Sequence, residues 1–412
     1  MKAITAQIDL GIDPTAIGAR GTLWKDTETT LAGVGEAARI PIDRAGGGEA
    51  AKKAQEHLSS IISSSKEDQI SGCDLVAFAA FPFDPTLPGE LIIPRILLRS
   101  LPNEELSITA ISEEGLSLEE ATEEIISQAN QPDLSKPTRA DIKSLIPPDV
   151  WRDQLATDVI NRIQDGKLEK MVLAREIQIT SDTDINVAQV VHNLAKTNPN
   201  AMIFSVDKFI GASPELLVSR KDDVVQANPL AGTAIRLTDE KEDKKSMDFL
   251  LESVKDQYEH QITIEWLLNE LLPFCSYIDA DPEPRIVSLP NVHHLATKVH
   301  GRLSAPSASV LELVSALHPT PAVAGKPQAE AINLITEIEK DSRGKYAGPV
   351  GWVDADGNGA FAVGIRSAQI SGKEANLFAG VGIVADSDPQ SELDETDGKF
   401  LTMQQAIMST IR

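Results

Sequence analysis

The stretch LFAGVGIVADSDPQSELDETDGKF, residues 377–400, joins an apolar run interrupted by glycines to a tight cluster of carboxylates. Its first part, LFAGVGIV, has the apolar character of a short β-strand but carries few large side chains. Its second part begins the last helix of the chain, which we expect from about residue 391 to residue 412. The stretch raises the question of what requires so many acids directly behind a strand with so little side-chain bulk.

Three charged residues of this helix lie on one face. Glu392, Glu395 and Lys399 are spaced by three and four residues, so their side chains are neighbours on an ideal helix. Phe400 lies on an adjacent apolar face, which can anchor the helix. Gly398 costs about 1 kcal/mol relative to alanine inside a helix, so it predicts close approach of another group to the backbone. On their own, the acids also fit a solvated helix N-terminus.

The remaining pattern predicts an α+β fold. Strand-like segments occur in runs and are separated by long helical patterns without strict alternation, which favours α+β over a doubly wound parallel sheet. We expect a helix over residues 150–168 and another over residues 243–272. The strand-like segments are residues 75–83, 90–100, 170–179, 201–206, 216–220, 360–370 and 377–384.

The chain divides unevenly along its length. Residues 1–140 alternate apolar strand-like pieces with polar stretches rich in glycine and serine. A polar connector over residues 127–148 leads into a denser pattern of helices and strands. We therefore expect a variable N-terminal portion, residues 1–140, of the same α+β unit, and a catalytic region over residues 150–412.

Composition excludes several classes of partner. The 412 residues include 38 Lys and Arg against 62 Asp and Glu, for a net charge of −24. This charge repels nucleic acid and anionic membranes, so an anionic ligand would need a local cation. The longest apolar run is far shorter than a membrane span. Cys73 and Cys275 lie far apart and form no Cys-x-x-Cys pattern, so we expect a reduced, cytoplasmic protein.

Three further segments carry candidate chemistry. Glu259 lies within the long helical pattern, and if it faced Glu392 and Glu395 the three carboxylates would form an oxygen-only site suited to magnesium. Lys170 begins an apolar strand, where loss of water could make it a general base, although a strand-edge lysine that prevents aggregation is an equal alternative. Glu215 follows a Ser-Pro turn and could be a partly buried acid.

Taken together, these segments resemble the chorismate-utilising enzymes, and within them the isochorismate synthases. The resemblance covers residues 150–412, and the order of the matching segments makes it far more specific than any one of them. In chain order the segments are KLEKMVLAR, GASPELLVSR, NPLAGTAIR, KDQYEH, HHLATKVHG, LHPTPAVAG, RGKYAGPVGW, GIRSAQI, LFAGVGIV and SELDETDGK.

The resemblance implies large antiparallel or mixed sheets packed with helices, an active site between two halves, and chorismate as substrate. In the manner of the family, Glu259 and Glu395 would bind Mg2+, with Glu392 binding it directly or through water. Lys170 would deprotonate the water that attacks ring carbon 2. Glu215 would protonate the hydroxyl that leaves carbon 4. The protein would then be an isomerase, an isochorismate synthase.

The same resemblance assigns the substrate contacts. Carboxylates of the substrate would meet cationic side chains, a phenol would add a hydroxyl donor, and glycines would let backbone amides approach the ligand. Two further side chains would line the ring pocket. Arg366 and Lys399 would be the cations, and Tyr346 the phenol. Gly380 and Gly382 would supply the backbone contacts, and Gly232 and Thr233 similar ones. His294 and Ala322 would line the ring pocket.

Two alternatives stay open. Salicylate synthases share the lysine but also eliminate pyruvate, and they commonly have threonine where this chain has Ala322. A module of another class, which binds a divalent cation or an anion without catalysis, would be favoured if Lys170 and Glu215 lay more than ~10 Å from the metal carboxylates. A water-using enzyme needs no glutaminase subunit, so we expect a monomer. The product could serve either menaquinone or siderophore synthesis.

Overall fold

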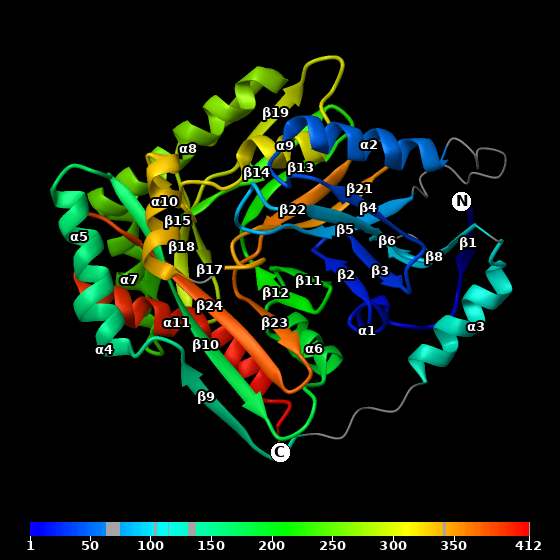
Figure 1. Ribbon diagram of the computed structural model, residues 1–412, viewed down its shortest axis with the longest axis horizontal. Helices are drawn as coiled ribbons and strands as arrows, with labels where there is room; N and C mark the ends of the chain where they lie inside the picture. The colour runs from blue at the N-terminus through cyan, green and yellow to red at the C-terminus, as the bar shows by residue number, and fades with distance from the viewer. Residues whose placement is uncertain (63–74, 103–104, 114, 131–136, 341–342, 412) are drawn as a thin grey trace.

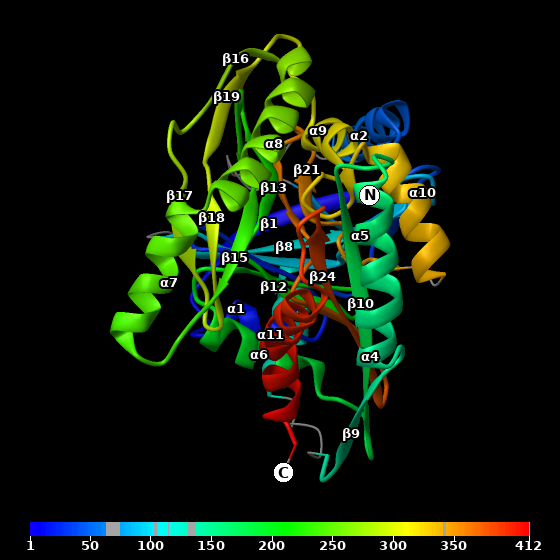
Figure 2. The same cartoon turned by 90° about the vertical axis from the view of Figure 1, so that its left-hand side faces the viewer.

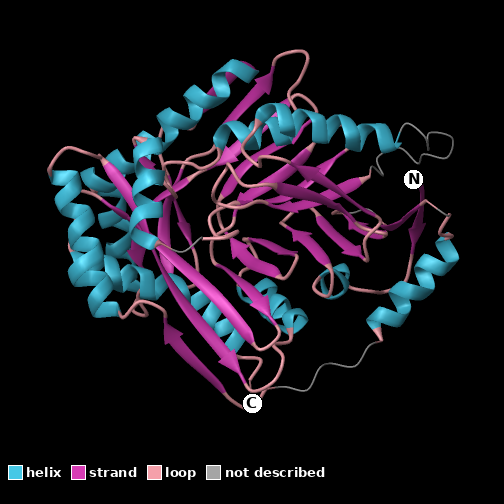
Figure 3. Cartoon of the chain, viewed as in Figure 1, coloured by secondary structure: helices cyan, strands magenta, loops and turns pink. Residues whose placement is uncertain are grey.

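The computed structural model describes residues 1–62, 75–102, 105–113, 115–130, 137–340 and 343–411. Within them, β-strands fill the middle of the molecule and helices lie on the outside (Figures 1 and 3). The strand pairs in this part of the chain all run antiparallel. The predicted α+β class, with large antiparallel sheets and packed helices, is confirmed.

The largest sheet has 12 strands and contains the strand of the opening stretch. Its strand β24 (Glu374–Ile383) pairs with β10 (Lys170–Ser181), the longest strand described. The remaining strands, from one edge toward β24, are β1 (Lys2–Ile8), β8 (Leu106–Ser112), β7 (Ile96–Ser100), β3 (Thr30–Val34), β2 (Thr22–Lys25), β11 (Met202–Val206), β12 (Phe209–Ser213) and β23 (Ser367–Ser371), with β20 (Gly325–Lys326) and β9 (Ala140–Ser144) beside β10.

A second sheet has nine strands and a third has three. The order in the nine-stranded sheet is β16 (Cys275–Ala280), β19 (Val299–Leu303), β14 (Val224–Asn228), β13 (Leu216–Lys221), β22 (Gly359–Val363), β21 (Pro349–Asp354), β5 (Val76–Ala80), β6 (Gly89–Ile93) and β4 (Ala38–Ile42). The small sheet consists of β15 (Leu230–Ile235), β18 (Val292–Ala296) and β17 (Arg285–Ser288).

Three apolar cores define the layers. One lies between the two large sheets and joins, for example, Trp24 and Phe204 of the first sheet to Phe78 and Val350 of the second. A second core packs the outer face of the 12-stranded sheet against α1 (Pro14–Gly18), α3 (Leu118–Ala129), α6 (Val187–Thr197) and α11 (Pro389–Met408). The third packs the nine-stranded sheet and the ends of β10 and β24 against α2 (Gly48–Ile62), α5 (Thr157–Gln164), α8 (Val254–Leu271), α9 (Val310–Leu317) and α10 (Gln328–Glu339).

The strands of the N-terminal part enter both large sheets. The predicted strand over residues 90–100 is in fact two strands, because β6 joins the nine-stranded sheet and β7 the 12-stranded one. The polar connector also contains structure, since β9 pairs with β10. Beyond it, α4 (Pro148–Val150), a π-helical turn (Trp151–Ala156) and α5 follow one another, as the helical pattern over residues 150–168 predicts. The assignment of residues 150–412 as the catalytic region stays a prediction.

The long helical pattern over residues 243–272 is interrupted, contrary to the prediction of one helix. Ser253 adopts an extended conformation between α7 (Glu240–Glu252) and α8, and its side chain accepts a hydrogen bond from the Asp256 amide. Serine is a preferred N-cap because it satisfies an amide that has no partner inside the helix. The break therefore starts α8 as a separate helix, three residues before Asp256 and six before Glu259.

Local sequence explains both β24 and α11. Along β24 the buried residues alternate with less buried ones, and Gly380 and Gly382 fall on the less buried side. Helix α11 begins at Pro389, and the Asp388 carboxylate caps it by accepting from the Ser391 amide. The prediction for Gly398 is wrong, because a Cβ atom there would meet nothing within 4 Å.

Two remaining features are the character of the helices and the state of the cysteines. None of the helices in the described part of the chain combines the length and the apolar character needed to cross a bilayer. Cys275 has a free thiol, whereas Cys73 lies outside the described residues.

Candidate active site

A pocket opens where the small sheet, α8 and α11 meet the end of the β10–β24 pair. The turned view of Figure 2 shows α7, α8 and the small sheet on one side, β10 and β24 on the other, and α11 below them. The pocket is lined by Lys170, Val172, Glu215, Leu230, Ala231, Gly232, Thr233, Asp256, Glu259, His294, Ala322, Val323, Tyr346, Ile365, Arg366, Gly380, Val381, Gly382, Glu392, Glu395 and Lys399.

Every site residue expected from the sequence lines this one pocket. The structure thus brings together segments that are far apart in the chain, and every lining residue belongs to residues 150–412. Their catalytic and binding roles stay predictions. Asp256 also lines the pocket and was not among the expected site residues, although it precedes Glu259 by three residues and therefore shares its helix face. The apolar lining residues carried no signal that separates them from core residues.

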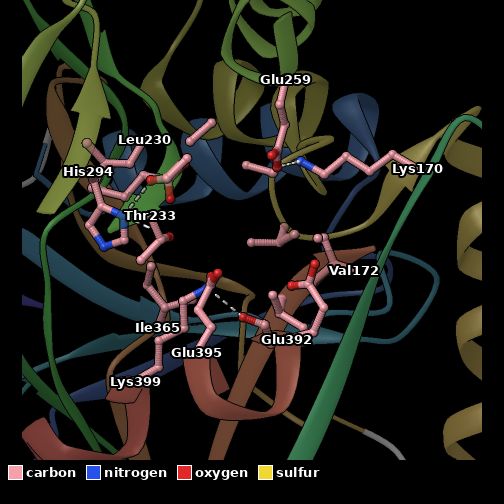
Figure 4. Close-up of a pocket in the computed structure, with 18 of the residues that line it drawn as sticks. Lys170, Val172, Leu230, Thr233, Glu259, His294, Ile365, Glu392, Glu395 and Lys399 are labelled. Carbon is pink, nitrogen blue, oxygen red and sulfur yellow. Dashed lines mark hydrogen bonds and ion pairs between the residues drawn. The ribbon is translucent and has the colours of Figure 1, made fainter. Parts of the chain in front are cut away.

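Two carboxylates of the expected metal site are each paired with a lysine. Lys170 Nζ lies 2.5 Å from Glu259 Oε1, and Lys399 Nζ lies 2.6 Å from Glu395 Oε1. Lys399 also donates to the Gly380 carbonyl at 2.9 Å. Figure 4 shows Glu259 and Lys170 entering from one side of the pocket and Glu392, Glu395 and Lys399 from the helix on the opposite side. Acidic side chains on two helices therefore face one cavity, with lysines balancing their charge.

These residues fit a magnesium ion by their chemistry. Glu259, Glu392 and Glu395 offer hard carboxylate oxygens, and the pocket contains neither cysteine sulfur nor a histidine pair that would favour zinc. Among the described residues, however, no three acidic, histidine or cysteine side chains already form a compact group that could hold a metal. The two lysine ammonium groups instead balance part of the negative charge that a cation would neutralise.

Glu215 has the properties of an acid that holds its proton near neutral pH. Its side chain is buried just before β13, and the Ser213 hydroxyl accepts a hydrogen bond from its backbone amide at 3.3 Å. Burial raises the pKa of Glu215 from 4.5 to about 7, against the opposing influence of a backbone hydrogen bond and of nearby Lys170, Arg366 and Lys399. This carboxyl can therefore donate a proton to a bound ligand.

His294 and Arg366 form a buried polar pair in the same pocket. Arg366 Nη2 lies 3.1 Å from His294 Nε2, and His294 Nδ1 lies 3.0 Å from the Gly232 carbonyl oxygen. Because a guanidinium can only donate, Nε2 accepts and Nδ1 carries the proton. Burial, with Arg366 and Lys399 nearby, lowers the pKa of His294 to about 3. His294 is therefore a neutral acceptor that orients Arg366. Gly232, whose carbonyl accepts the hydrogen bond from His294, adopts a left-handed backbone conformation with φ of 68°.

The glycines of β24 make room for functional side chains. A Cβ atom at Gly382 would lie 2.8 Å from Lys170 Cε and 2.9 Å from Glu259 Oε1, and one at Gly380 would lie 3.0 Å from the Tyr346 hydroxyl. The Tyr346 ring stacks on Phe378, with centroids 5.2 Å apart. The strand is poor in side chains because the space above it is occupied by side chains from other elements.

The chain is similar to known proteins over most of its length. The sequence profile of the family described as chorismate binding enzyme matches residues 15–408. The chain is 34% identical to isochorismate synthase MenF of Bacillus subtilis over 359 residues, which cover 82% of this chain and 76% of that protein. It is 40% identical to isochorismate synthase DhbC of the same organism over 257 residues, 60% of this chain, and that match spans 65% of the relative.

A solved structure shows the same architecture. The crystal structure of a putative 2,3-dihydroxybenzoate-specific isochorismate synthase, DhbC from Bacillus anthracis, superposes with a TM-score of 0.80 at 30% identity and covers 94% of this chain and 96% of that chain. The protein belongs to the chorismate-binding enzyme family. The predicted family and the predicted fold are confirmed, and with them the expectation of an enzyme.

We predict that Gly382→Ala lowers kcat, because the added methyl group displaces Lys170 and Glu259. Misplacing a reacting group by about 1 Å can reduce the rate ~100-fold. Steady-state kinetics with chorismate measures the effect. Gly398→Ala is the matched control, since its methyl group enters open space and is expected to leave kcat unchanged while raising helix stability by up to ~1 kcal/mol. Equal kcat for Gly382→Ala and wild type would contradict this reading of β24.

We also predict a stability difference between wild type and Glu215→Gln that depends on pH. The pKa of Glu215 rises from 4.5 to about 7 on folding, so the folded protein retains a proton that the unfolded chain has lost. Wild-type stability relative to the variant therefore falls as pH rises from 4.5 to about 7, by on the order of 3 kcal/mol, and is constant above that. Denaturant unfolding at several pH values tests this, and a difference that does not vary with pH would refute it.

Proposed function

We propose that this protein is a magnesium-dependent isochorismate synthase. The observation that carries the proposal is the presence of Lys170 and Glu215, one base and one acid, in the same pocket as Glu259, Glu392 and Glu395. Lys170 contacts Glu259 directly, so the separation of more than ~10 Å from the metal carboxylates that would have favoured a non-catalytic binding module is not found for the lysine. The names of the relatives support the same activity.

Lys170 would accept a proton from the water that attacks carbon 2 of the ring. Its side chain is 4% exposed, so little bulk water competes with the substrate for it. A base needs a free electron pair on Nζ, so before Lys170 can act it has to give up its contact with Glu259 and lose its ammonium proton to water. A cation bound by Glu259 and Glu395 would replace the lysines as the partner of these carboxylates, and magnesium would supply electrostatic stabilisation of the ring carboxylate as the double bonds shift.

Glu215 would act at the other end of the reaction. Hydroxide is a poor leaving group, and a carboxyl that keeps its proton near neutral pH can protonate the oxygen on carbon 4 as the bond breaks. Water adds at carbon 2, a water molecule leaves from carbon 4, and the enolpyruvyl group is retained. The net reaction is an isomerisation, with base and acid on different parts of the ring.

Cationic residues would bind the two carboxylates of chorismate. Arg366 is buried and oriented by His294, so it is suited to hold one carboxylate in a fixed direction. Lys399 would be released from Glu395 in the same exchange that frees Lys170. Tyr346 would add a hydroxyl contact, with Gly380 and Thr233 providing further polar groups along the pocket wall.

We predict that the pure protein, given chorismate and magnesium, forms isochorismate reversibly and releases pyruvate only at background level. Pyruvate loss requires transfer of the hydrogen on carbon 2 to the enolpyruvyl group in an aligned geometry, and the small Ala322 side chain does little to hold that alignment. Chromatography of the products and a coupled pyruvate assay measure both outcomes. Stoichiometric pyruvate and salicylate would establish the salicylate synthase alternative, and chorismate binding without turnover would establish a binding module.

We further predict that Lys170→Ala abolishes turnover while retaining chorismate binding, because a general base acts mainly in the transition state. Glu259→Gln should also lose turnover, because one hard anionic ligand is lost from the expected cation site. Substrate binding by calorimetry and steady-state kinetics separate the two roles. A rise in KM alone for Lys170→Ala would make Lys170 a binding residue, and near-normal activity of Glu259→Gln at modest magnesium would remove it from the metal site.

A further inference from the structure

Arg175 is a buried cation that the proposed mechanism does not use. It lies on β10, five residues after Lys170, and is only 5% exposed. Its guanidinium lies 5.8 Å from the centroid of the Trp151 ring and 5.7 Å from that of Phe400. Trp151 is itself fixed by a 3.1 Å hydrogen bond from its indole nitrogen to the Ala174 carbonyl. The guanidinium is therefore held between two aromatic rings of other elements.

The polar contacts of Arg175 all lead to one segment of α11. Its Nη1 donates to the Thr396 hydroxyl at 2.6 Å, to the Asp397 carboxylate at 2.7 Å and to the Leu393 carbonyl at 3.4 Å. Leu393 and Thr396 directly follow Glu392 and Glu395 in the helix, and these two glutamates line the pocket. The strand that carries Lys170 is thus tied directly to the helix turn that carries two of the proposed metal ligands.

Packing alone does not account for a cation at this position. Removing a guanidinium from water is costly, and an apolar side chain could fill the space between two rings at lower cost. Only one of the partners, Asp397, is a carboxylate, and its side chain is 61% exposed. What the guanidinium adds is direction, because its hydrogen bonds reach a hydroxyl, a carboxylate and a carbonyl at defined places on the helix.

We propose that Arg175 is a positioning residue that fixes the rotation of α11 about its axis. Each residue of an α-helix turns the chain by about 100°, so a slip of one residue would carry Glu392 and Glu395 away from the pocket. Phe400 and Ile407 anchor the helix to the core, but apolar contacts are not directional. Arg175 supplies the directional restraint, and its effect on chemistry passes through the proposed metal ligands. The inference therefore rests on the proposed function.

The test compares magnesium binding by wild type, Arg175→Lys and Ile407→Ala, using isothermal titration calorimetry with magnesium alone. Residues that orient ligands typically change metal affinity or activity ~10-fold or more when replaced. We expect Arg175→Lys to weaken magnesium binding ~10-fold and to raise the magnesium concentration for half-maximal turnover equally, with kcat largely recovered at saturating magnesium. Ile407→Ala, which removes a fully buried side chain from the same helix, should lower thermal stability but leave magnesium affinity unchanged.

The outcomes separate this inference from the proposed function. Absence of magnesium binding by wild type would overturn the proposed function. Wild-type affinity in Arg175→Lys would overturn the positioning role alone, and an equal loss of affinity in Ile407→Ala would leave Arg175 a structural residue. If circular dichroism shows that Arg175→Lys is unfolded, Thr396→Val serves as a second variant. It removes the hydroxyl that accepts from Arg175 and keeps nearly the same side-chain shape, so we expect it also to weaken magnesium binding. Unchanged affinity in Thr396→Val would then overturn the proposal.

Discussion

The arrangement of the pocket depends on the pairing of acids with lysines inside a partly buried space. An unpaired charge in such a place is costly, so each carboxylate needs a partner. Glu259 has Lys170 and Glu395 has Lys399. These pairs come from different elements, because β10 and α8 supply one and α11 supplies the other. Holding them in one cavity requires the sheets and helices around it to be fixed relative to one another.

The fold meets that requirement through its layers. The apolar core between the two large sheets joins N-terminal strands to C-terminal ones, and helices seal the outer faces. The pocket opens at the end of β10 and β24, where the small sheet and α8 approach α11. The described part of residues 1–112 supplies strands to both large sheets but none of the side chains that line the pocket. Their contribution is to the core that supports the site.

The charge of the pocket also explains how an acidic protein could bind the dianionic substrate proposed for it. The net charge of −24 would repel chorismate at long range, yet Arg366, Lys170 and Lys399 all face the cavity. A divalent cation on the glutamates would increase the local positive charge further. The exchange of lysine partners for a cation would then bring the base, the carboxylate-binding lysine and the metal site into their working state together.

The sequence by itself determined the family, the α+β class, and most of the polar residues that line the pocket, because each of these depends on local segments that keep their order along the chain. It also indicated which residues share a helix face, since helical spacing is a local property. It did not separate β6 from β7, and its prediction for Gly398 was wrong, because these depend on which sheet a strand joins and on what lies nearby. The break at Ser253 rests on a local serine cap, which lies inside a continuous helical pattern and was therefore missed.

Only the tertiary structure decided which side chains meet. The pairing of Lys170 with Glu259, the neutral form of His294 and the high pKa of Glu215 result from burial and from partners distant in sequence. The contacts of Arg175 also depend on the tertiary structure. In the sequence it is an ordinary residue of a predicted strand, and its hydrogen-bond partners lie on α11, more than 200 residues away. Electrostatic interactions act over a few ångströms in space with no regard to separation along the chain, so their strength is set by the folded arrangement.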